Sequence, residues 1–265
     1  MQFGLIGEKL GHSFSSAIHA KIGLYEYELH ELPPDSLETF LAEADFRGVN
    51  VTIPYKEAVI PFLDELSERA SAIGAVNTIV NRRGKLCGYN TDFGGLEALI
   101  RKMGLQLEGE TVLVTGAGGT AKTAQAVAES LGAARVVKLS RTGRESALTY
   151  EQAYASFPDA RILINTTPVG MYPDTQSTPV DLSRLPELAG VVDVVYNPLT
   201  TRLVEEARAK GIAAENGLYM LVAQAVFAAE LFTGASLGEG EIRRVYRELL
   251  LEVDDAIPSK PESLG

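Results

Sequence analysis

The chain has 265 residues, of which 46% are hydrophobic and 22% charged, and its formal net charge is −11 at pH 7. This composition is typical of an ordinary globular protein with one large domain or two moderate ones, and its acidity argues against nucleic acid and anionic membrane as partners. One cysteine excludes an intramolecular disulfide, three histidines argue against a metal site, and the lack of a signal-peptide pattern or a membrane-length apolar run favours the cytoplasm.

The first ninety residues alternate between strand and helix signals. The patterns predict strands at residues 2–7, 25–29, 48–53, 76–80 and 86–89, with a hairpin turn at 82–85. They predict helices at residues 15–24, 36–44 and 57–66. Such alternation indicates an α/β domain built from βαβ units.

A predicted helix at residues 92–103 leads into a second unit. This unit begins with a continuous apolar strand at 111–115, the type that is buried in parallel sheets. Further strands are expected at 136–139, 162–165, 191–195 and 212–214, and helices at 121–131, 201–209, 217–232 and 240–253. The pattern predicts a doubly wound sheet with two closing helices, followed by a flexible tail at 254–265.

A lysine follows directly after the predicted strand at 48–53. Pro54 must end this strand, because proline lacks a backbone donor and has a fixed φ. Lys56 then stands at the start of the predicted helix 57–66, where the helix dipole disfavours a positive charge. A lysine in this position could exchange a proton near neutral pH as a general acid or base. The alternative is a solvated surface lysine.

A glycine-rich turn joins the strand at 111–115 to the next helix. Its sequence is Gly116-Ala117-Gly118-Gly119-Thr120-Ala121. Glycines let the backbone turn tightly and approach a pyrophosphate, which then meets the amide groups of the helix N-terminus. The pattern is looser than G-x-G-x-x-G, so a glycine-rich turn that binds nothing is the alternative.

The end of the following strand bears on the choice of cofactor. A site for NAD is expected to carry an acidic residue there, but this chain has Ser140-Arg141-Thr142, with Arg144 close behind. A guanidinium group and two hydroxyls suit a 2′-phosphate. The sequence therefore favours NADP over NAD, unless Arg141 is an ordinary loop arginine.

Two polar segments of the first unit are candidates for a substrate site. Ser13 and Ser15 lie near the start of the helix at 15–24, where hydroxyls can bind a carboxylate or simply cap the helix. Asp92 follows Gly88-Tyr89-Asn90-Thr91 and places a carboxylate at the start of another helix, as an N-cap or as a functional group.

Nine segments of the chain resemble the shikimate dehydrogenase family. They occur in order as HSFSSAIH, GVNVTIPYKE, GAVNT, GYNTD, GAGGTAK, SRT, NTTPVGM, DVVYNP and GLYMLVAQA, and the resemblance runs from residue 3 to about residue 251. It implies NADPH-dependent reduction of the small molecule 3-dehydroshikimate to shikimate, a step of aromatic amino-acid and chorismate biosynthesis. The oligomeric state, monomer or homodimer, is left open.

The resemblance also implies a domain division. An N-terminal substrate-binding domain would comprise residues 1–97 together with the returning C-terminal helices at 219–265. A Rossmann-like NADP-binding domain would comprise residues 98–218, and the reaction would take place in the cleft between the two.

Individual residues acquire implied roles in the same way. Lys56 and Asp92 match the catalytic pair of the family. The implied substrate-binding residues are Ser13, Ser15, Thr52, Asn77, Tyr196 and Gln224. The implied cofactor-binding residues are Gly116, Ala117, Gly118, Gly119, Thr120, Ala121, Ser140, Arg141, Thr142, Arg144, Asn165, Thr166, Gly217 and Met220.

Three other functions are known on related two-domain scaffolds. A quinate dehydrogenase that uses NAD is disfavoured by Ser15, because threonine at this position goes with quinate within the resemblance. A folate-type methylene dehydrogenase is disfavoured by the GYNTD segment and Gln224. A non-catalytic NADP sensor would need neither Lys56 nor Asp92, and the chain has both.

Overall fold

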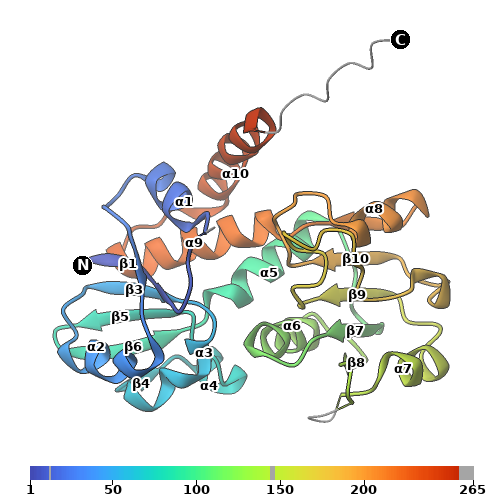
Figure 1. Ribbon diagram of the computed structural model, residues 1–265, viewed down its shortest axis with the longest axis horizontal. Helices are drawn as coiled ribbons and strands as arrows, with labels where there is room; N and C mark the ends of the chain where they lie inside the picture. Colours follow the sequence, from blue (N-terminus) through green and yellow to red (C-terminus); the bar gives the residue numbers. More distant parts are fainter. Residues whose placement is uncertain (12, 144–146, 257–265) are drawn as a thin grey trace.

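The computed structural model describes residues 1–11, 13–143 and 147–256, which form two sheets surrounded by helices (Figure 1). In spatial order, the first sheet contains β2 (Glu28–Glu31), β1 (Phe3–Gly7), β3 (Gly48–Val51), β5 (Thr78–Arg82), β6 (Lys85–Tyr89) and β4 (Glu65–Leu66). The second contains β11 (Ala213–Glu215), β10 (Gly190–Asp193), β9 (Ile162–Asn165), β7 (Thr111–Thr115) and β8 (Arg135–Leu139). The predicted α/β fold with a doubly wound second sheet is confirmed.

The first sheet is mixed in direction. β1 pairs in parallel with β2 and β3, whereas β5 runs antiparallel to β3 and β6. The turn between β5 and β6 has positive φ at Arg83 and Gly84, which a two-residue hairpin turn needs. The helices of this half are α1 (Ser15–Ile22), α2 (Leu37–Glu43), α3 (Tyr55–Ala58), α4 (Glu68–Ile73) and α5 (Thr91–Lys102), with single 3₁₀ turns at Pro34–Ser36 and Ile60–Phe62.

The second sheet is parallel throughout. From β7 the chain passes through α6 (Gly119–Ser130) to β8 on one side, and then through α7 (Tyr150–Ser156) to β9 on the other. The strand order therefore reverses beside β7, and such a switch point leaves a crevice at the carboxyl ends of the strands. A 3₁₀ turn at Leu182–Arg184 precedes β10, and α8 (Arg202–Ala209) precedes β11.

Two C-terminal helices, α9 (Leu218–Thr233) and α10 (Gly238–Ala256), return to the first half. Figure 1 shows α9 and α5 between the two sheets. The two helices can approach closely because Gly95 has no side chain: a Cβ there would lie 2.6 Å from the carbonyl oxygen of Met220. At the far end of α9, the Phe232 ring packs 5.3 Å from the Phe3 ring of β1. Among the described residues, no helix is long and apolar enough to cross a membrane.

The predicted helix at 57–66 is wrong. Only α3 forms, and a 3₁₀ turn and the short strand β4 follow it. Pro61 is the reason, because it has no N–H for an α-helical bond and its ring would clash with the carbonyl of Glu57. The helices α4 and α7 were not predicted, and the strand predicted at 25–29 forms at 28–31. Residues 254–256 of the predicted tail belong to the end of α10, and residues 257–265 lie outside the described part.

Candidate active site

A cavity of about 960 Å³ opens between the two halves of the molecule. One wall comes from the segment 53–58, which follows β3. The opposite wall comes from the segments that follow β7, β8 and β9, namely 116–121, 140–141 and 166–170. Because the carboxyl ends of these three parallel strands meet here, the cavity occupies the switch-point crevice in which open α/β sheets bind ligands.

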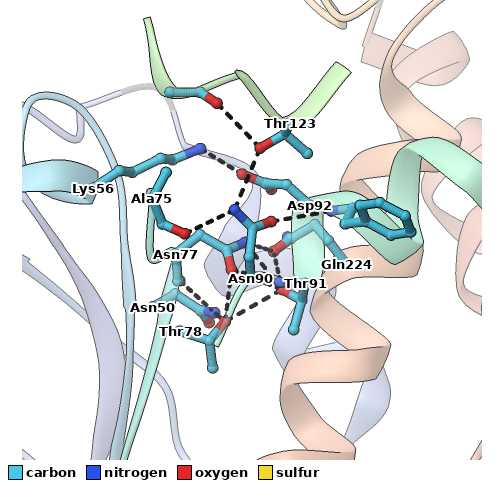
Figure 2. A network of polar contacts seen from close by, with 12 residues as sticks. Asn50, Lys56, Ala75, Asn77, Thr78, Asn90, Thr91, Asp92, Thr123 and Gln224 are labelled. Carbon is cyan, nitrogen blue, oxygen red and sulfur yellow. Dashed lines mark hydrogen bonds and ion pairs between the residues drawn. The ribbon is translucent and has the colours of Figure 1, made fainter. Parts of the chain in front are cut away.

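Lys56 and Asp92 form an ion pair beside this cavity (Figure 2). The distance from Lys56 Nζ to Asp92 Oδ2 is 2.6 Å, and the two side chains are only 16% and 10% exposed. Little water screens the pair, so its charges interact more strongly than those of a surface pair. The ammonium group has three donors, which leaves two for the oxygen atoms of a ligand.

Asn90, rather than Asp92, is the N-cap of α5. Its Oδ1 accepts the Phe93 N–H at 3.1 Å. Its Nδ2 donates to Thr123 Oγ1 at 3.3 Å, and Thr123 Oγ1 donates to the Gly119 carbonyl at 3.1 Å. Figure 2 shows this chain of contacts beside the ion pair. The start of the helix that carries Asp92 is thus tied to the glycine-rich turn, and Asp92 itself is free to bind Lys56.

A second polar cluster lies next to the ion pair (Figure 2). Asn77 Nδ2 donates to Thr91 Oγ1 at 2.9 Å and to Gln224 Oε1 at 3.4 Å. Asn77 Oδ1 accepts the Thr91 N–H at 2.7 Å. In the same cluster, Asn50 Nδ2 donates to Thr78 Oγ1 at 3.0 Å. These mutual bonds hold amide donors and acceptors in fixed orientations, which suits a ligand that carries several hydroxyl groups.

Ser13 and Ser15 lie at the start of α1. The Ser13 hydroxyl donates to the Ser15 hydroxyl at 3.0 Å and accepts the Ser15 backbone N–H at 3.2 Å. Phe14 occupies the N-cap position, and its ring lies 5.4 Å from the Tyr196 ring. Burial raises the pKa of Tyr196, so its hydroxyl keeps its proton. Two serine hydroxyls and a phenol in one neighbourhood can bind a carboxylate.

The glycine-rich turn leaves the backbone bare where β7 meets α6. Gly116 has a φ of 111°, and a Cβ there would lie 2.6 Å from Thr166 Oγ1, so a side chain would be both strained and blocked. A Cβ on Gly118 would meet nothing within 4 Å. The first turn of α6 lines the cavity; its Ala121 N–H bonds to the Gly118 carbonyl at 2.9 Å, and the N–H groups of Gly119 and Thr120 come before the first bond of the helix. This arrangement fits a pyrophosphate.

The end of β8 offers polar groups that could hold a further phosphate. Ser140 Oγ is buried and has no hydrogen-bond partner within the described part of the chain. Arg141 is exposed and makes no ion pair with any described residue. Both residues line the cavity together with Tyr150, the first residue of α7. A hydroxyl and a guanidinium group at this strand end fit the 2′-phosphate of NADP.

Comparisons with known proteins agree with this geometry. The family model for the shikimate dehydrogenase substrate binding domain matches residues 5–79. A protein named shikimate dehydrogenase (NADP(+)), from Clostridium perfringens (strain 13 / Type A), is 38% identical over 271 residues, which cover 93% of this chain and 97% of that protein. The chain belongs to the shikimate dehydrogenase family.

Solved structures of shikimate dehydrogenases share the whole fold. A chorismate mutase/shikimate 5-dehydrogenase fusion protein from Clostridium acetobutylicum superposes with a TM-score of 0.89 at 34% identity, covering 95% of this chain and 98% of that one. The shikimate 5-dehydrogenase of Thermus thermophilus, solved in complex with NADP(H) and shikimate, gives a TM-score of 0.83 at 35% identity, covering 94% and 99%.

The residues assigned from the resemblance to shikimate dehydrogenases fall into distinct places. Those that line the cavity are Lys56, Gly116, Ala117, Gly118, Gly119, Thr120, Ala121, Ser140, Arg141 and Thr166. Thr52 is half-buried directly after β3, and Thr142 is exposed outside the cavity lining. Asn165, Gly217 and Met220 are buried and do not line the cavity. Arg144 lies outside the described residues.

Several residues that line the cavity were not predicted. Glu57 reaches from α3 to Lys122 of α6, with 2.7 Å between Oε2 and Nζ, and thereby joins the two halves. Tyr150 stands at the start of α7, which Thr149 and Gln152 begin with a capping box. That T-x-x-Q signal could have revealed the helix. Nothing in the sequence points to the contact between Glu57 and Lys122.

Proposed function

We propose that the chain catalyses the reversible, NADPH-dependent reduction of 3-dehydroshikimate to shikimate in the biosynthesis of aromatic amino acids. The observation that supports this most directly is the ion pair of Lys56 and Asp92 beside a cavity whose opposite wall is a glycine-rich turn. A proton donor and a dinucleotide site thus lie on opposite sides of one space. The relative from Clostridium perfringens carries this enzyme name, and the Thermus thermophilus structure contains both ligands.

We further propose that residues 1–97 with 219–265 bind the substrate and that residues 98–218 bind NADP. The mixed sheet with the returning helices α9 and α10 supports the first unit, and the parallel sheet with its switch point supports the second. All candidate residues come from a single chain, so either a monomer or each subunit of a homodimer would carry a complete site.

In the proposed reaction, Lys56 carries out the proton transfer. NADPH, when bound against the glycine-rich turn, supplies the hydride for the ketone carbon. Lys56 Nζ donates a proton to the ketone oxygen in the reducing direction and receives one from the hydroxyl in the oxidising direction. Asp92 Oδ2, at 2.6 Å, holds Nζ in place. The low exposure of both side chains keeps competing water away from this transfer.

The remaining polar groups would orient the substrate. Ser13, Ser15 and Tyr196 offer three hydroxyls for its carboxylate, and Asn77 and Gln224 offer amides for its ring hydroxyls. Thr52 would add a further hydroxyl at the end of β3. Because these groups are held by one another or by packing, few side chains would have to be ordered when the substrate binds, which lowers the entropic cost of binding.

The cofactor would be held chiefly by backbone and by charge. Amide groups at the start of α6 would bind the pyrophosphate, and the glycines at 116 and 118 would let it approach the backbone. Ser140 and Arg141 would bind the 2′-phosphate and select NADP over NAD.

A matrix of initial rates tests the proposed function. NADPH or NADH formation is followed by absorbance with shikimate or quinate as the alcohol and NADP or NAD as the acceptor. We expect the highest kcat/KM for the combination of shikimate and NADP. A higher kcat/KM with quinate and NAD would assign a quinate dehydrogenase instead, and NADPH binding without any turnover would support a sensor.

A further inference from the structure

Asp193, the last residue of β10, is a buried carboxylate that the proposed reaction does not use. Its exposed fraction is 0%, and it has no cationic partner among the described residues. Three neutral donors hold it: Oδ1 accepts from Asn165 Nδ2 at 2.9 Å and from the Val195 N–H at 3.1 Å, and Oδ2 accepts from Thr201 Oγ1 at 2.7 Å. Burial raises the pKa of Asp193. A buried carboxylate without a cation is costly to the fold, which calls for a physical reason.

The carboxylate determines the orientation of the neighbouring Asn165 amide. Both Asp193 oxygens accept hydrogen bonds, so Asn165 turns its Nδ2 toward Asp193 and its Oδ1 the opposite way. There Oδ1 accepts three bonds: from Thr115 Oγ1 at 2.6 Å, from the Thr167 N–H at 3.0 Å and from Thr167 Oγ1 at 2.7 Å. The orientation of one amide thus fixes both the backbone and the side chain of Thr167.

Thr166 and Thr167 line the cavity opposite Lys56. The Thr166 hydroxyl donates to the Thr115 carbonyl, and Thr166 Oγ1 would lie 2.6 Å from a Cβ on Gly116. This short stretch therefore abuts the glycine-rich turn without spare room. If Thr167 shifted, the gap between the stretch and the turn would change where the cofactor is expected to bind.

We propose that Asp193 is a positioning residue for NADP, which acts through Asn165 to hold Thr166 and Thr167 against the glycine-rich turn. This inference rests on the proposed function, because NADP is the ligand concerned. It also gives Asn165 a different role from the direct contact that the family resemblance implies. Asn165 has an exposed fraction of 0% and lies behind the cavity wall, so its effect on the cofactor passes through Thr167.

Two substitutions at one position separate positioning from mere burial. D193A removes the short bond of Asn165 Nδ2 and leaves it only the long bond to the Thr167 carbonyl at 3.4 Å, which lets the amide turn. D193N keeps the shape: its amide oxygen can accept from Asn165 and Val195, while its NH₂ donates to the Thr201 hydroxyl, which can accept as well as donate. We expect D193A to raise KM for NADP about tenfold, the usual effect of losing a hydrogen bond to a charged group, and D193N to stay within about threefold of wild type.

The readouts are KM for NADP, KM for shikimate and the Kd of NADPH from a fluorescence titration without shikimate. KM for shikimate should stay within about twofold, because the amide cluster of Asn77 and Gln224 lies next to the ion pair of Lys56 and Asp92, whereas Asp193 belongs to the second sheet. N81A is the matched control: Asn81 also joins two segments, through Ala44 O at 2.9 Å and the Gly84 N–H at 2.8 Å, but in the first sheet. It should lower stability and leave KM for NADP unchanged.

Wild-type KM for NADP in folded D193A would overturn the inference, and so would an equal rise in both KM values. If D193A does not fold, T167V takes its place, since Thr167 is partly exposed and the buried pair stays intact. We expect T167V to raise KM for NADP about fivefold and T167S to restore it, and no change in T167V would be equally decisive. A wild-type chain that does not bind NADPH would instead refute the proposed function.

Discussion

The proposed substrate and cofactor regions differ in how far their polar side chains are already paired. On the substrate side the polar side chains are already paired, Lys56 with Asp92 and Asn77 with Gln224. On the cofactor side Ser140 Oγ has no partner in the described part of the chain.

The difference follows from the chemistry of the expected ligands. Apart from its carboxylate, the expected substrate presents a neutral ketone and neutral hydroxyls, which are recognised by groups that stand in fixed orientations in a poorly solvated site. Phosphates carry their own charge and bind where amide groups and a guanidinium are still free. We therefore expect substitutions on the substrate side to act on turnover or stability and those on the cofactor side to act on KM for NADP.

The largest expected effect is that of K56A, which removes the proposed proton donor. The value of kcat should fall by about a thousandfold, within the usual range for a general acid, while the Kd of NADPH changes little. K102A is the matched control, because Lys102 also pairs with a carboxylate, Glu215 at 3.3 Å, on the exposed surface. Steady-state kinetics and NADPH titration check both variants. Near-normal kcat in K56A would break the proposed division of roles.

His19 lies on α1 one turn after Ser15, and its titration tests whether solvent protons reach the interior behind the proposed substrate site. Its ring stacks 3.8 Å from the Tyr27 ring, its Nδ1 lies 2.8 Å from the Tyr25 hydroxyl, and it is 1% exposed. Burial lowers the pKa of His19 from 6.5 to about 3. Between these two pH values His19 is protonated in the unfolded chain but not in the folded chain. The free energy of unfolding therefore decreases as the pH falls through this window.

H19F keeps an aromatic ring on Tyr27 and removes the titration. At pH 7 we expect wild type to be more stable than H19F by roughly 1–2 kcal/mol, because the variant leaves the Tyr25 hydroxyl unpaired. This advantage should shrink and then reverse as the pH is lowered from 6.5 toward 3. Urea unfolding at several pH values measures it. A difference that stays constant over this range would mean that His19 is accessible to protons in the folded state.

On the proposed cofactor side, R141Q should weaken the binding of NADP and leave the binding of NAD unaffected. Losing the proposed charge-assisted bond to the 2′-phosphate should raise KM for NADP about tenfold. R161Q serves as control, because Arg161 lies in the same half and pairs with Glu187 at 3.7 Å outside the cavity lining. If KM rose equally for NAD and NADP, Arg141 would act on the shared part of the cofactor rather than on the phosphate.

Features with a local signal could be predicted from the sequence. The apolar run at 111–115 followed by glycines predicted β7, the turn and α6, because burial and turning both depend on neighbouring residues. Two further local signals are present in the sequence: Pro61 excludes a helix at 57–66, and the capping box of Thr149 and Gln152 marks the start of α7.

Contacts between distant segments could not be predicted in this way. Asn165 and Asp193 are 28 residues apart and meet only because β9 and β10 pair in register. The family resemblance placed Asn165 near the cofactor, but the bond that explains its position depends on the folded sheet. Glu57 and Lys122 come from opposite walls of the cavity, and their pairing depends on how the two halves are placed.

The smallest expected effect comes from removing this ion pair. It joins the two halves of the molecule, so it tests a contribution that neither the substrate side nor the cofactor side makes alone. The side chains of Lys122 and Glu57 are 37% and 49% exposed, so the pair should contribute only about 0.2–1 kcal/mol. We expect E57Q and K122Q each to lower kcat/KM about two- to fivefold, because both remove the contact between the turn that carries Lys56 and the helix that follows the glycines.

The kcat/KM of the double variant should be no lower than that of either single variant, since both substitutions remove the same interaction. Raising the salt concentration should lower the wild-type value toward that of the variants, because ions screen an exposed pair. Fully additive effects without salt dependence would mean that the two residues act separately, each on its own side of the cavity.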